Sequence, residues 1–202
     1  LNAAVEPHHL EEVAAALLSA TGEQNPRLAW EVNMGSLEAV LEVAREQRCA
    51  VFTPSSIGAF GPDTPKDSTP QDTVMRPATM YGITKVAGEL LCDYYHERYG
   101  VDTRGVRFPG LISYGAPPGG GTTDWAVDIF YKAVSEGRYT CFLRSDSQLD
   151  MMYMPDAIRA TIELMERSSE SVKIRSSYNL AGFSFTPEEI ADEIKKHISD
   201  FE

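Results

Sequence analysis

Residues 51–85 read VFTPSSIGAFGPDTPKDSTPQDTVMRPATMYGITK, and this stretch decides the fold that we expect. A short β-rich run, Ala50–Thr53, leads to the serine pair Ser55–Ser56. A loop rich in proline, aspartate and threonine follows, and then a helix carries Tyr81 and Lys85 near its start. This order of strand, polar loop and helix predicts an α/β fold with a ligand site at the end of the strand.

Tyr81 and Lys85 are four residues apart, so on a helix they lie on one face, one turn apart. An ammonium there favours the tyrosinate and is expected to lower the pKa of Tyr81, while its other donors suit a ribose hydroxyl. Ser56, alone or together with Ser55, is expected to hold a substrate oxygen beside the phenol. The pattern therefore predicts a proton-transfer site for oxidising an alcohol or reducing a carbonyl, with Tyr81, Lys85, Ser56 and Ser55 as candidate catalytic residues.

Each of these features also has an ordinary structural explanation. A Tyr-x-x-x-Lys spacing fits a helix that shows its lysine to water, and a strand-end serine can close the strand in a turn. The serine pair about 25 residues upstream of Tyr81, and the strand pattern downstream of the helix, favour the catalytic interpretation.

Composition restricts the possible partners. The 202 residues carry a net charge of −12, which disfavours nucleic acid and anionic membranes as partners. The three cysteines lack metal-ligand spacing, so we predict a reducing compartment, no disulfide framework and no metal site. The sequence contains no apolar run long enough to span a membrane. We expect an intracellular protein, in the mitochondrial matrix if eukaryotic and in the cytoplasm if bacterial.

Several stretches resemble the short-chain-type L-threonine 3-dehydrogenases, which belong to the extended short-chain dehydrogenase/reductase superfamily together with the sugar-nucleotide 4-epimerases. They are PSSIGAFGP, RPATMYGITKVAGELL, RFPGLIS, PGGGTTDWAVDIF, MMYMPDAIRATIELME and SFTPEEIA. The resemblance runs from about Leu17 to the end of the chain. It implies a Rossmann-type doubly wound parallel sheet with a small C-terminal substrate lobe. It also implies NAD as cofactor and oxidation of L-threonine to L-2-amino-3-oxobutanoate.

The resemblance suggests how the chain is divided. Residues 1–112 are expected to form the dinucleotide-binding Rossmann portion, and residues 113–202 a substrate-binding lobe mixed with remaining Rossmann elements. Pro7–Leu18 has helix-like composition, whereas the resemblance implies a strand before LLSATGE. No G-x-x-G-x-x-G loop for the pyrophosphate precedes it, so we expect an incomplete N-terminal βαβ unit. Either the chain is a fragment or residues are missing just before Leu17, the alternative that we favour.

The resemblance also implies contacts with the cofactor and the substrate. The candidate cofactor-binding residues are Tyr81, Lys85, Leu111, Leu18, Ser19 and Asn33, of which Asn33 supports the site through a water or backbone contact. The candidate substrate-binding residues are Ser19, Ser56, Thr122, Thr123 and Asp124, where hydroxyls meet polar groups and the carboxylate pairs with the ammonium. As alternatives, Ser19 is a helix cap or loop residue, Leu111 lies at a plain strand exit, and Thr123 or Asp124 caps the helix that follows.

Periodicity and turn residues predict the other elements. Helices are expected from Asn25-Pro26 to about Gln47, over Met80–Tyr99, from Asp156 to Met165, and after a cap at Thr186; strands are expected over Thr103–Phe108, Arg138–Leu143, Leu149–Met154 and Tyr178–Leu180. The helix over Met80–Tyr99 shows an apolar stripe of Ile83, Val86, Ala87, Leu90, Leu91, Tyr94 and Tyr95. Such a stripe fits a core face, and the resemblance implies instead that this helix pairs with its copy in a homodimer.

Two departures bear on the substrate. Sugar-nucleotide enzymes of the superfamily carry Arg-Asp-Tyr where this chain has Leu149-Asp150-Met151, and RxxN where it has Arg107-Phe108-Pro109-Gly110. Losing the first arginine removes a bidentate phosphate contact, which argues against a sugar nucleotide. A sugar-nucleotide epimerase or dehydratase, and a non-catalytic NAD-binding remnant, remain the alternatives to a threonine dehydrogenase.

Overall fold

The computed structural model describes residues 9–11, 19–115, 117–118 and 121–202. They form two compact units. The first contains the residues up to Arg107 together with Arg159–Leu180, and the second contains Phe108–Ile158 together with Ala181–Glu202. The backbone therefore passes between the units at residues 107–108, 158–159 and 180–181. Arg159–Leu180 is a segment of the C-terminal half that returns to the Rossmann-type unit.

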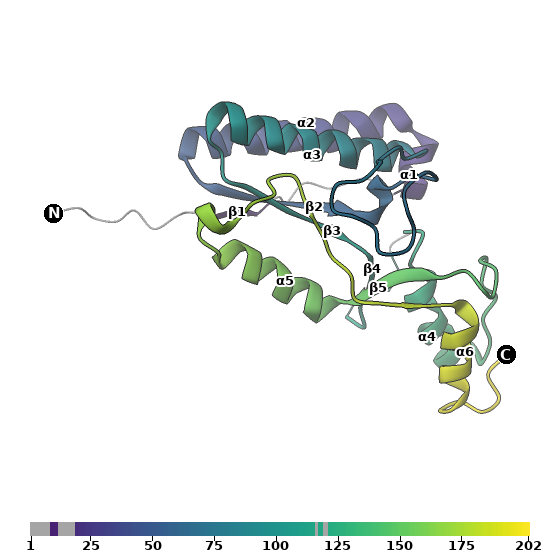
Figure 1. The fold of residues 1–202 in the computed structure, drawn as a ribbon. Helices are drawn as coiled ribbons and strands as arrows, with labels where there is room; N and C mark the ends of the chain where they lie inside the picture. The colour runs from purple at the N-terminus through teal and green to yellow at the C-terminus, as the bar shows by residue number, and fades with distance from the viewer. Residues whose placement is uncertain (1–8, 12–18, 116, 119–120) are drawn as a thin grey trace. The chain divides into compact units, whose positions relative to one another are not determined.

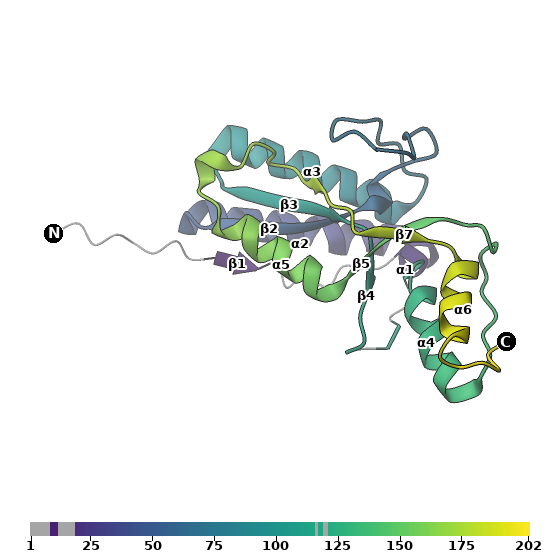
Figure 2. The ribbon, with the colours of Figure 1, turned by 60° about the horizontal axis from the view of Figure 1, so that its bottom comes forward.

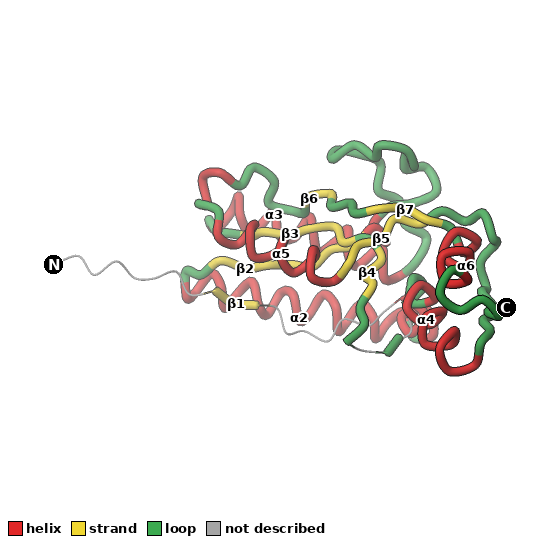
Figure 3. Tube along the Cα trace, turned by 90° about the horizontal axis from the view of Figure 1, so that it is seen from below, coloured by secondary structure: helices red, strands yellow, loops and turns green. Residues whose placement is uncertain are grey.

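The first unit is a doubly wound α/β sheet, as predicted. Its four strands lie in the order β1 (His9–Glu11), β2 (Ala50–Ser56), β3 (Thr103–Phe108) and β6 (Tyr178–Asn179). β1 runs parallel to β2, and β3 runs parallel to β6. The helices α2 (Pro26–Gln47) and α3 (Met80–Tyr99) lie side by side on one face, and the part of α5 (Met154–Glu166) from Arg159 onward covers the other (Figure 1). Figure 3 views the same sheet from below, with its strands in yellow and the helices in red.

Strand β1 corrects the helix-like interpretation of Pro7–Leu18. His9, Leu10 and Glu11 pair with Ala50, Val51 and Phe52 of β2. Backbone pairing to a neighbouring strand outweighs the local helix propensity of a three-residue segment. A short helix, α1 (Ser19–Gln24), follows the undescribed residues 12–18.

The long helices begin and end where the sequence predicted. The Asn25 side chain accepts a hydrogen bond from the Leu28 amide at 3.2 Å, and Pro26 occupies the first turn of α2. Thr79 caps α3 in the same way, and α3 ends at Gly100, whose φ of 70° belongs to the left-handed region that glycine tolerates. Local capping chemistry therefore sets the bounds of both helices.

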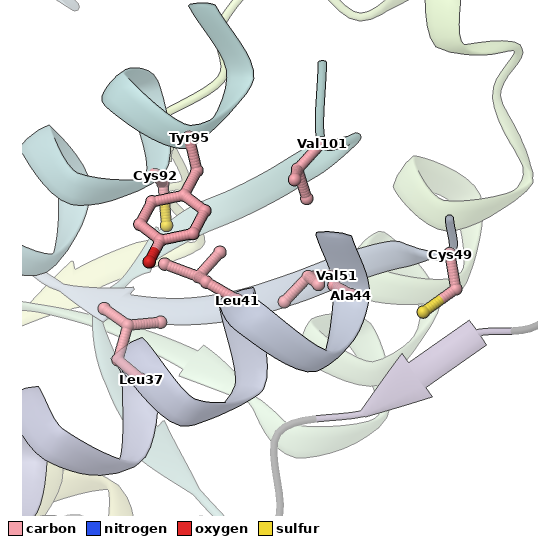
Figure 4. Close-up of a cluster of buried hydrophobic side chains, with 8 residues drawn as sticks. All are labelled: Leu37, Leu41, Ala44, Cys49, Val51, Cys92, Tyr95 and Val101. Carbon is pink, nitrogen blue, oxygen red and sulfur yellow. The ribbon is translucent and has the colours of Figure 1, made fainter. Parts of the chain in front are cut away.

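The core of the first unit lies between α2, α3 and β2. Its buried members are Leu37, Leu41, Ala44, Cys49, Val51, Cys92, Tyr95 and Val101 (Figure 4). Leu41 and Val51 are fully buried, so the α2 and β2 side chains that face each other exclude water.

The buried face of α3 differs from the apolar stripe that we predicted. The buried residues are Gly82, Thr84, Gly88, Glu89, Cys92 and Tyr95. Of the predicted stripe only Tyr95 is buried, whereas Ile83, Leu90 and Tyr94 are exposed. The glycines let the helix backbone approach its neighbours, and the buried Thr84 and Glu89 are satisfied by hydrogen bonds, so small and polar residues occupy the inner face.

The second unit contains its own sheet and core. Strand β5 (Leu149–Tyr153) lies between β4 (Gly110–Ile112), to which it is parallel, and β7 (Phe183–Phe185), to which it is antiparallel. The helices α4 (Trp125–Glu136) and α6 (Pro187–Lys195) pack against each other (Figure 2). The predicted cap of the last helix is confirmed, because Thr186 and Glu189 form a reciprocal capping box.

The strand predicted over Arg138–Leu143 is wrong. Residues 138–148 are all described and form turns and irregular backbone. The Tyr139 amide donates to the Glu202 carbonyl at 2.9 Å, and the Ser145 carbonyl accepts from the Glu188 amide at 3.2 Å. These backbone groups bond to the C-terminal segment instead of to a sheet neighbour, so alternating hydrophobicity did not produce a strand.

Within the described ranges, no helix is long and apolar enough to cross a bilayer. The same residues contain no group of three or more histidine, cysteine, aspartate or glutamate side chains that could hold a metal ion.

Substituting Leu41 tests the core between α2 and β2. Leu41→Ala removes a fully buried side chain and is expected to lower the free energy of unfolding by about 3 kcal/mol, because it leaves a cavity that the helices close only in part. The control is Val43→Ala, on the same helix but exposed, which should change stability by no more than about 0.5 kcal/mol. Chemical denaturation measures both, and equal losses would contradict this assignment of the core.

Candidate active site

The site is built around the C-terminal end of β2. Ser56 is the last residue of this strand, and its Oγ accepts a hydrogen bond from the Gly58 amide at 3.0 Å. A hydroxyl that accepts from the backbone keeps its own proton for a second partner. Tyr81 lies beside it: a Cβ built at Gly58 would be 3.4 Å from Ser56 Oγ and 2.9 Å from Tyr81 Cε1, and hydrogen bonding from Ser56 lowers the pKa of Tyr81. Parallel sheets bind ligands at this edge, so the serine lies where a substrate oxygen is expected.

The first turns of α3 bring Tyr81 and Lys85 to the same strand end. The Lys85 ammonium donates to the Pro54 carbonyl at 2.7 Å and lies 5.4 Å from the centre of the Tyr81 ring. A Cβ at Gly58 would lie 2.9 Å from Tyr81 Cε1, so the glycine allows the turn after β2 to pack against the phenol ring. The structure thus brings together Ser56, Tyr81 and Lys85 as the sequence pattern predicted.

The pKa of Tyr81 differs in sign from our prediction. Burial raises the pKa of Tyr81 above its ordinary value, and the hydrogen bond with Ser56 lowers it by less. We had expected the Lys85 ammonium to hold this pKa down.

Ser55 is directed to a different partner from Ser56. It is buried, and its Oγ donates to Glu89 Oε1 at 2.5 Å. Ser55 is therefore engaged by Glu89, whereas the Ser56 hydroxyl lies beside the phenol. The catalytic roles of Ser56 and of Ser55 stay predictions.

Asn33 reaches the site through a side chain. Its Nδ2 donates to Thr84 Oγ1 at 3.1 Å, and Thr84 Oγ1 donates to the Tyr81 carbonyl at 2.8 Å. We had expected a contact through water or backbone. The observed chain of hydrogen bonds ties α2 to the turn of α3 that carries Tyr81.

Sequence reasoning missed a buried ion pair behind the site. Arg107 Nη2 lies 2.7 Å from Glu89 Oε2, and both side chains are at most 3% exposed. A signal for Glu89 existed in the sequence, because it lies four residues after Lys85 and eight after Tyr81 and so shares their face of the helix. The predicted apolar stripe lies on a different face of α3 and therefore did not indicate Glu89.

A small cavity lies against the same groups. Its volume is about 30 Å³, enough for roughly one water molecule. Residues of α2, β2 and α3 line it, including Asn33, Thr53, Ser55, Lys85 and Glu89. A cavity with this polar lining belongs to the site's supporting network, not to a substrate pocket of the size of an amino acid.

The other predicted contacts fall in the second unit. Leu111 lies in β4 opposite Met152, and a Cβ at the neighbouring Gly110 would lie 2.9 Å from Thr123. Thr123 thus packs against the strand that carries Leu111, and Thr122 beside it is exposed. The roles of Leu111, Thr122 and Thr123 toward cofactor and substrate stay predictions.

Asp124 does not cap α4 with its side chain. Its carboxylate accepts instead from the Gly121 amide at 2.8 Å, which closes the turn before the helix. The Thr123 and Asp124 backbone carbonyls accept the first amides of the helix, from Ala126 and Val127. The alternative of a side-chain cap by Asp124 is therefore not what the structure has, because its carboxylate bonds back to the loop.

Two predicted contacts cannot be placed. Leu18 lies outside the described residues. Ser19 begins α1, but its side chain is not among those described. Their roles at the nicotinamide and the substrate stay predictions.

The arrangement suits proton transfer beside a dinucleotide. Tyr81 supplies an ionisable phenol, Ser56 a hydroxyl donor and Lys85 a fixed cation, all at the carboxyl edge of a parallel sheet. A cationic donor one helical turn from a phenol fits the ribose hydroxyls and the reactive ring of NAD. The fold is Rossmann-type, and the site brings a phenol, a hydroxyl and an ammonium to the end of one strand.

Comparison with known proteins identifies the family. The chain belongs to the NAD-dependent epimerase/dehydratase family, whose model matches residues 2–181. An uncharacterised epimerase/dehydratase of Staphylococcus haemolyticus is 59% identical over 187 residues, which are 93% of this chain and 59% of that protein. The chain therefore spans about three fifths of the length of this relative. NAD is the cofactor of the family, as predicted.

Comparison with solved structures gives a more specific similarity than the family model does. The partial consensus L-threonine 3-dehydrogenase is 56% identical with a TM-score of 0.93, over 97% of this chain and 63% of that one. The holo form of L-threonine dehydrogenase from Cupriavidus necator is 56% identical with a TM-score of 0.92, over 97% and 64%. A monomeric L-threonine 3-dehydrogenase from a metagenome is 49% identical with a TM-score of 0.91, over 94% and 61%. The resemblance found in the sequence is confirmed.

The hydrogen bond between Ser56 and Tyr81 predicts a change in titration. Because this bond lowers the pKa of Tyr81 while burial raises it, Ser56→Ala should raise that pKa further above the ordinary value of 10.0. NMR of protein labelled with ¹³C at the tyrosine ζ carbon measures the titration, and Tyr81→Phe assigns the signal. Ser135→Ala, on α4, serves as the control and should leave the pKa unchanged. A fall in the pKa after Ser56→Ala would contradict the hydrogen bond.

Proposed function

We propose that the protein oxidises L-threonine to L-2-amino-3-oxobutanoate with NAD. The observation that carries the proposal is the placement of Tyr81, Ser56 and Lys85 together at the end of β2. The likeness to several L-threonine dehydrogenases supports the choice of substrate.

In the proposed mechanism, Tyr81 in its phenolate form takes the proton from the threonine hydroxyl. Ser56 donates a hydrogen bond to the same oxygen and stabilises it as it becomes a carbonyl. Lys85 holds the end of β2 through the Pro54 carbonyl and offers its charge to the ribose and to the phenolate. NAD supplies the acceptor for the hydride that leaves the carbon bearing the hydroxyl.

The second unit is proposed to bind the amino-acid part of threonine. Thr122 and Thr123 would contact its polar groups, and the Asp124 carboxylate would pair with its ammonium. Asp124 already accepts from the Gly121 amide, which fixes the carboxylate in its turn.

A sugar-nucleotide epimerase or dehydratase is the second candidate, because the family is named for both reactions. Arg107 is engaged by Glu89, Gln71 and Asn179, so it is not a ligand for a diphosphate in this arrangement. NADH formation with L-threonine supports the first candidate, and epimerisation or dehydration of UDP-sugars, which forms no net NADH and is followed through the sugar product, supports the second.

Replacing the phenol tests the proposed base. Tyr81→Phe should reduce kcat for threonine oxidation by about 10²-fold or more, the usual contribution of a general base. The matched control is Tyr99→Phe on the same helix, where the ring is exposed and the activity should stay at the parent level. NADH absorbance measures the rate, and near-normal activity of Tyr81→Phe would remove this residue from the mechanism.

We further propose that α3 pairs with its copy in a homodimer. Ile83, Leu90 and Tyr94 expose apolar surface along this helix, which a monomer would leave in water. At least one similar L-threonine 3-dehydrogenase is described as monomeric, so the association has to be measured directly.

A charge on the exposed face of α3 should prevent such a dimer. Leu90 is 61% exposed, so Leu90→Asp is expected to leave the fold intact and to dissociate the dimer to monomers at micromolar concentration. Val134→Asp introduces the same charge at an exposed apolar position of α4 and should leave the dimer unchanged. Sedimentation velocity measures both, and a monomeric parent protein would refute the proposal.

A further inference from the structure

The ion pair between Glu89 and Arg107 is the most completely buried pair of charges in the described part of the first unit. Arg107 Nε lies 3.0 Å from Glu89 Oε1, and Nη2 lies 2.7 Å from Oε2, so the guanidinium grips both carboxylate oxygens. Removing two charges from water costs nearly as much as their attraction returns, and an apolar pair often stabilises a fold equally well. The pair therefore contributes little net stability, and stability does not explain why these two charges are buried. The groups that the pair binds on either side are the alternative explanation.

On the side of Glu89, the pair holds the end of β2. Ser55 Oγ donates to Glu89 Oε1 at 2.5 Å, so the carboxylate fixes the residue directly before Ser56. Ser55 is the direct chain neighbour of Ser56, so fixing Ser55 restricts the backbone that carries the Ser56 hydroxyl beside Tyr81. Glu89 thus acts on the candidate catalytic hydroxyl without touching it.

On the side of Arg107, the pair holds the loop over the site. Nη1 donates to the Gln71 carbonyl at 3.0 Å and to Asn179 Oδ1 at 2.8 Å. The backbone amide of Asn179 in turn donates to Gln71 Oε1 at 2.8 Å. The guanidinium also lies 5.7 Å from the centre of the Phe60 ring, four residues after Ser56. A single side chain thereby fixes the middle of loop 61–77 and the turn that precedes it.

This loop ends at Tyr81. A Cβ at Gly61 would collide with the Arg76 carbonyl, so the two ends of the loop lie against each other. Thr79, just beyond the loop, accepts from the Gly82 amide at 3.1 Å and begins the helix turn that carries Tyr81. The loop therefore connects the turn after Ser56 to the first turn of α3, which carries Tyr81. The hydrogen bond from Arg107 to Gln71 holds the middle of this loop.

We propose that Glu89 and Arg107 are positioning residues, whose buried pair fixes Ser55 and loop 61–77 and so maintains the hydrogen bond between Ser56 and Tyr81. The kinetic part of this inference rests on the proposed function, whereas its structural part does not. Neither residue contacts the reacting atoms.

The test uses variants that keep the local net charge constant. Glu89→Leu combined with Arg107→Met removes both charges, and Arg107→Lys keeps the charge but loses the planar fork. Lys85, the charged group beside the Tyr81 ring, is unchanged in both. The pKa of Tyr81 is read by ¹³C NMR, stability by chemical denaturation, and turnover by NADH formation with L-threonine, all in the full-length protein.

We expect both variants to raise the pKa of Tyr81, as Ser56→Ala does, and to lower kcat by roughly 10- to 100-fold with a smaller change in KM. The double variant should keep most of the parent's stability, since it replaces a buried ion pair by apolar side chains. If the double variant does not fold, Arg107→Lys alone decides the question. An unchanged Tyr81 pKa in the folded variant would overturn the proposal.

Asp102→Asn provides the matched control. Asp102 pairs with Arg104, which is also buried but donates to the carbonyls of Leu164 and Met165, at the end of α5. This variant should lose stability without moving the Tyr81 titration, and an equal shift of that titration would mean that general loosening is responsible and would refute the inference. If the parent protein fails to oxidise threonine, the proposed function fails, and the titration still decides the role of the pair.

Discussion

The close approach of α3 to the end of β2 is the constraint on which the first unit depends. A side chain at Gly82 would collide with the Gly58 carbonyl, and one at Gly88 would lie 2.9 Å from Leu37 Cδ2. Because both positions are glycine, the helix backbone lies directly against the strand end on one side and α2 on the other. The helix can therefore deliver Tyr81 to the strand-end hydroxyl, and it buries polar residues where most helices bury leucine.

That approach has an electrostatic consequence for catalysis. Burial makes the Tyr81 phenol harder to ionise, which makes its phenolate a stronger base but a rarer one at neutral pH. The Ser56 hydrogen bond moves the balance back toward ionisation. In the proposed mechanism, the position of the serine would therefore affect both the base and the substrate, which is why we propose a role for the residues that fix it.

Local signals in the sequence predicted much of this structure. The helix starts at Asn25-Pro26 and at Thr186 were predicted correctly, because a cap needs only a few neighbouring residues. The Tyr81 and Lys85 spacing likewise follows from the period of one helix.

Features that depend on distant partners were not predicted. The three-residue strand β1 exists through its pairing with β2, and its own residues favour a helix. Glu89 can be buried because it pairs with Arg107, which is 18 residues away in the sequence. No pattern within α3 predicts that partner. The sign of the Tyr81 pKa shift also depends on how deeply the fold covers the ring, which spacing alone does not reveal.

The path of the chain between its units has a consequence for how the protein forms. The edge strand β6 belongs to the unit that begins with β1, yet the ribosome makes it only after residues 108–158, which belong to the other unit. The first unit must therefore wait, with the open side of β3 exposed, until about residue 180 has been translated. During that interval the nascent chain presents an unpaired edge, and a chaperone that shields it would favour correct assembly.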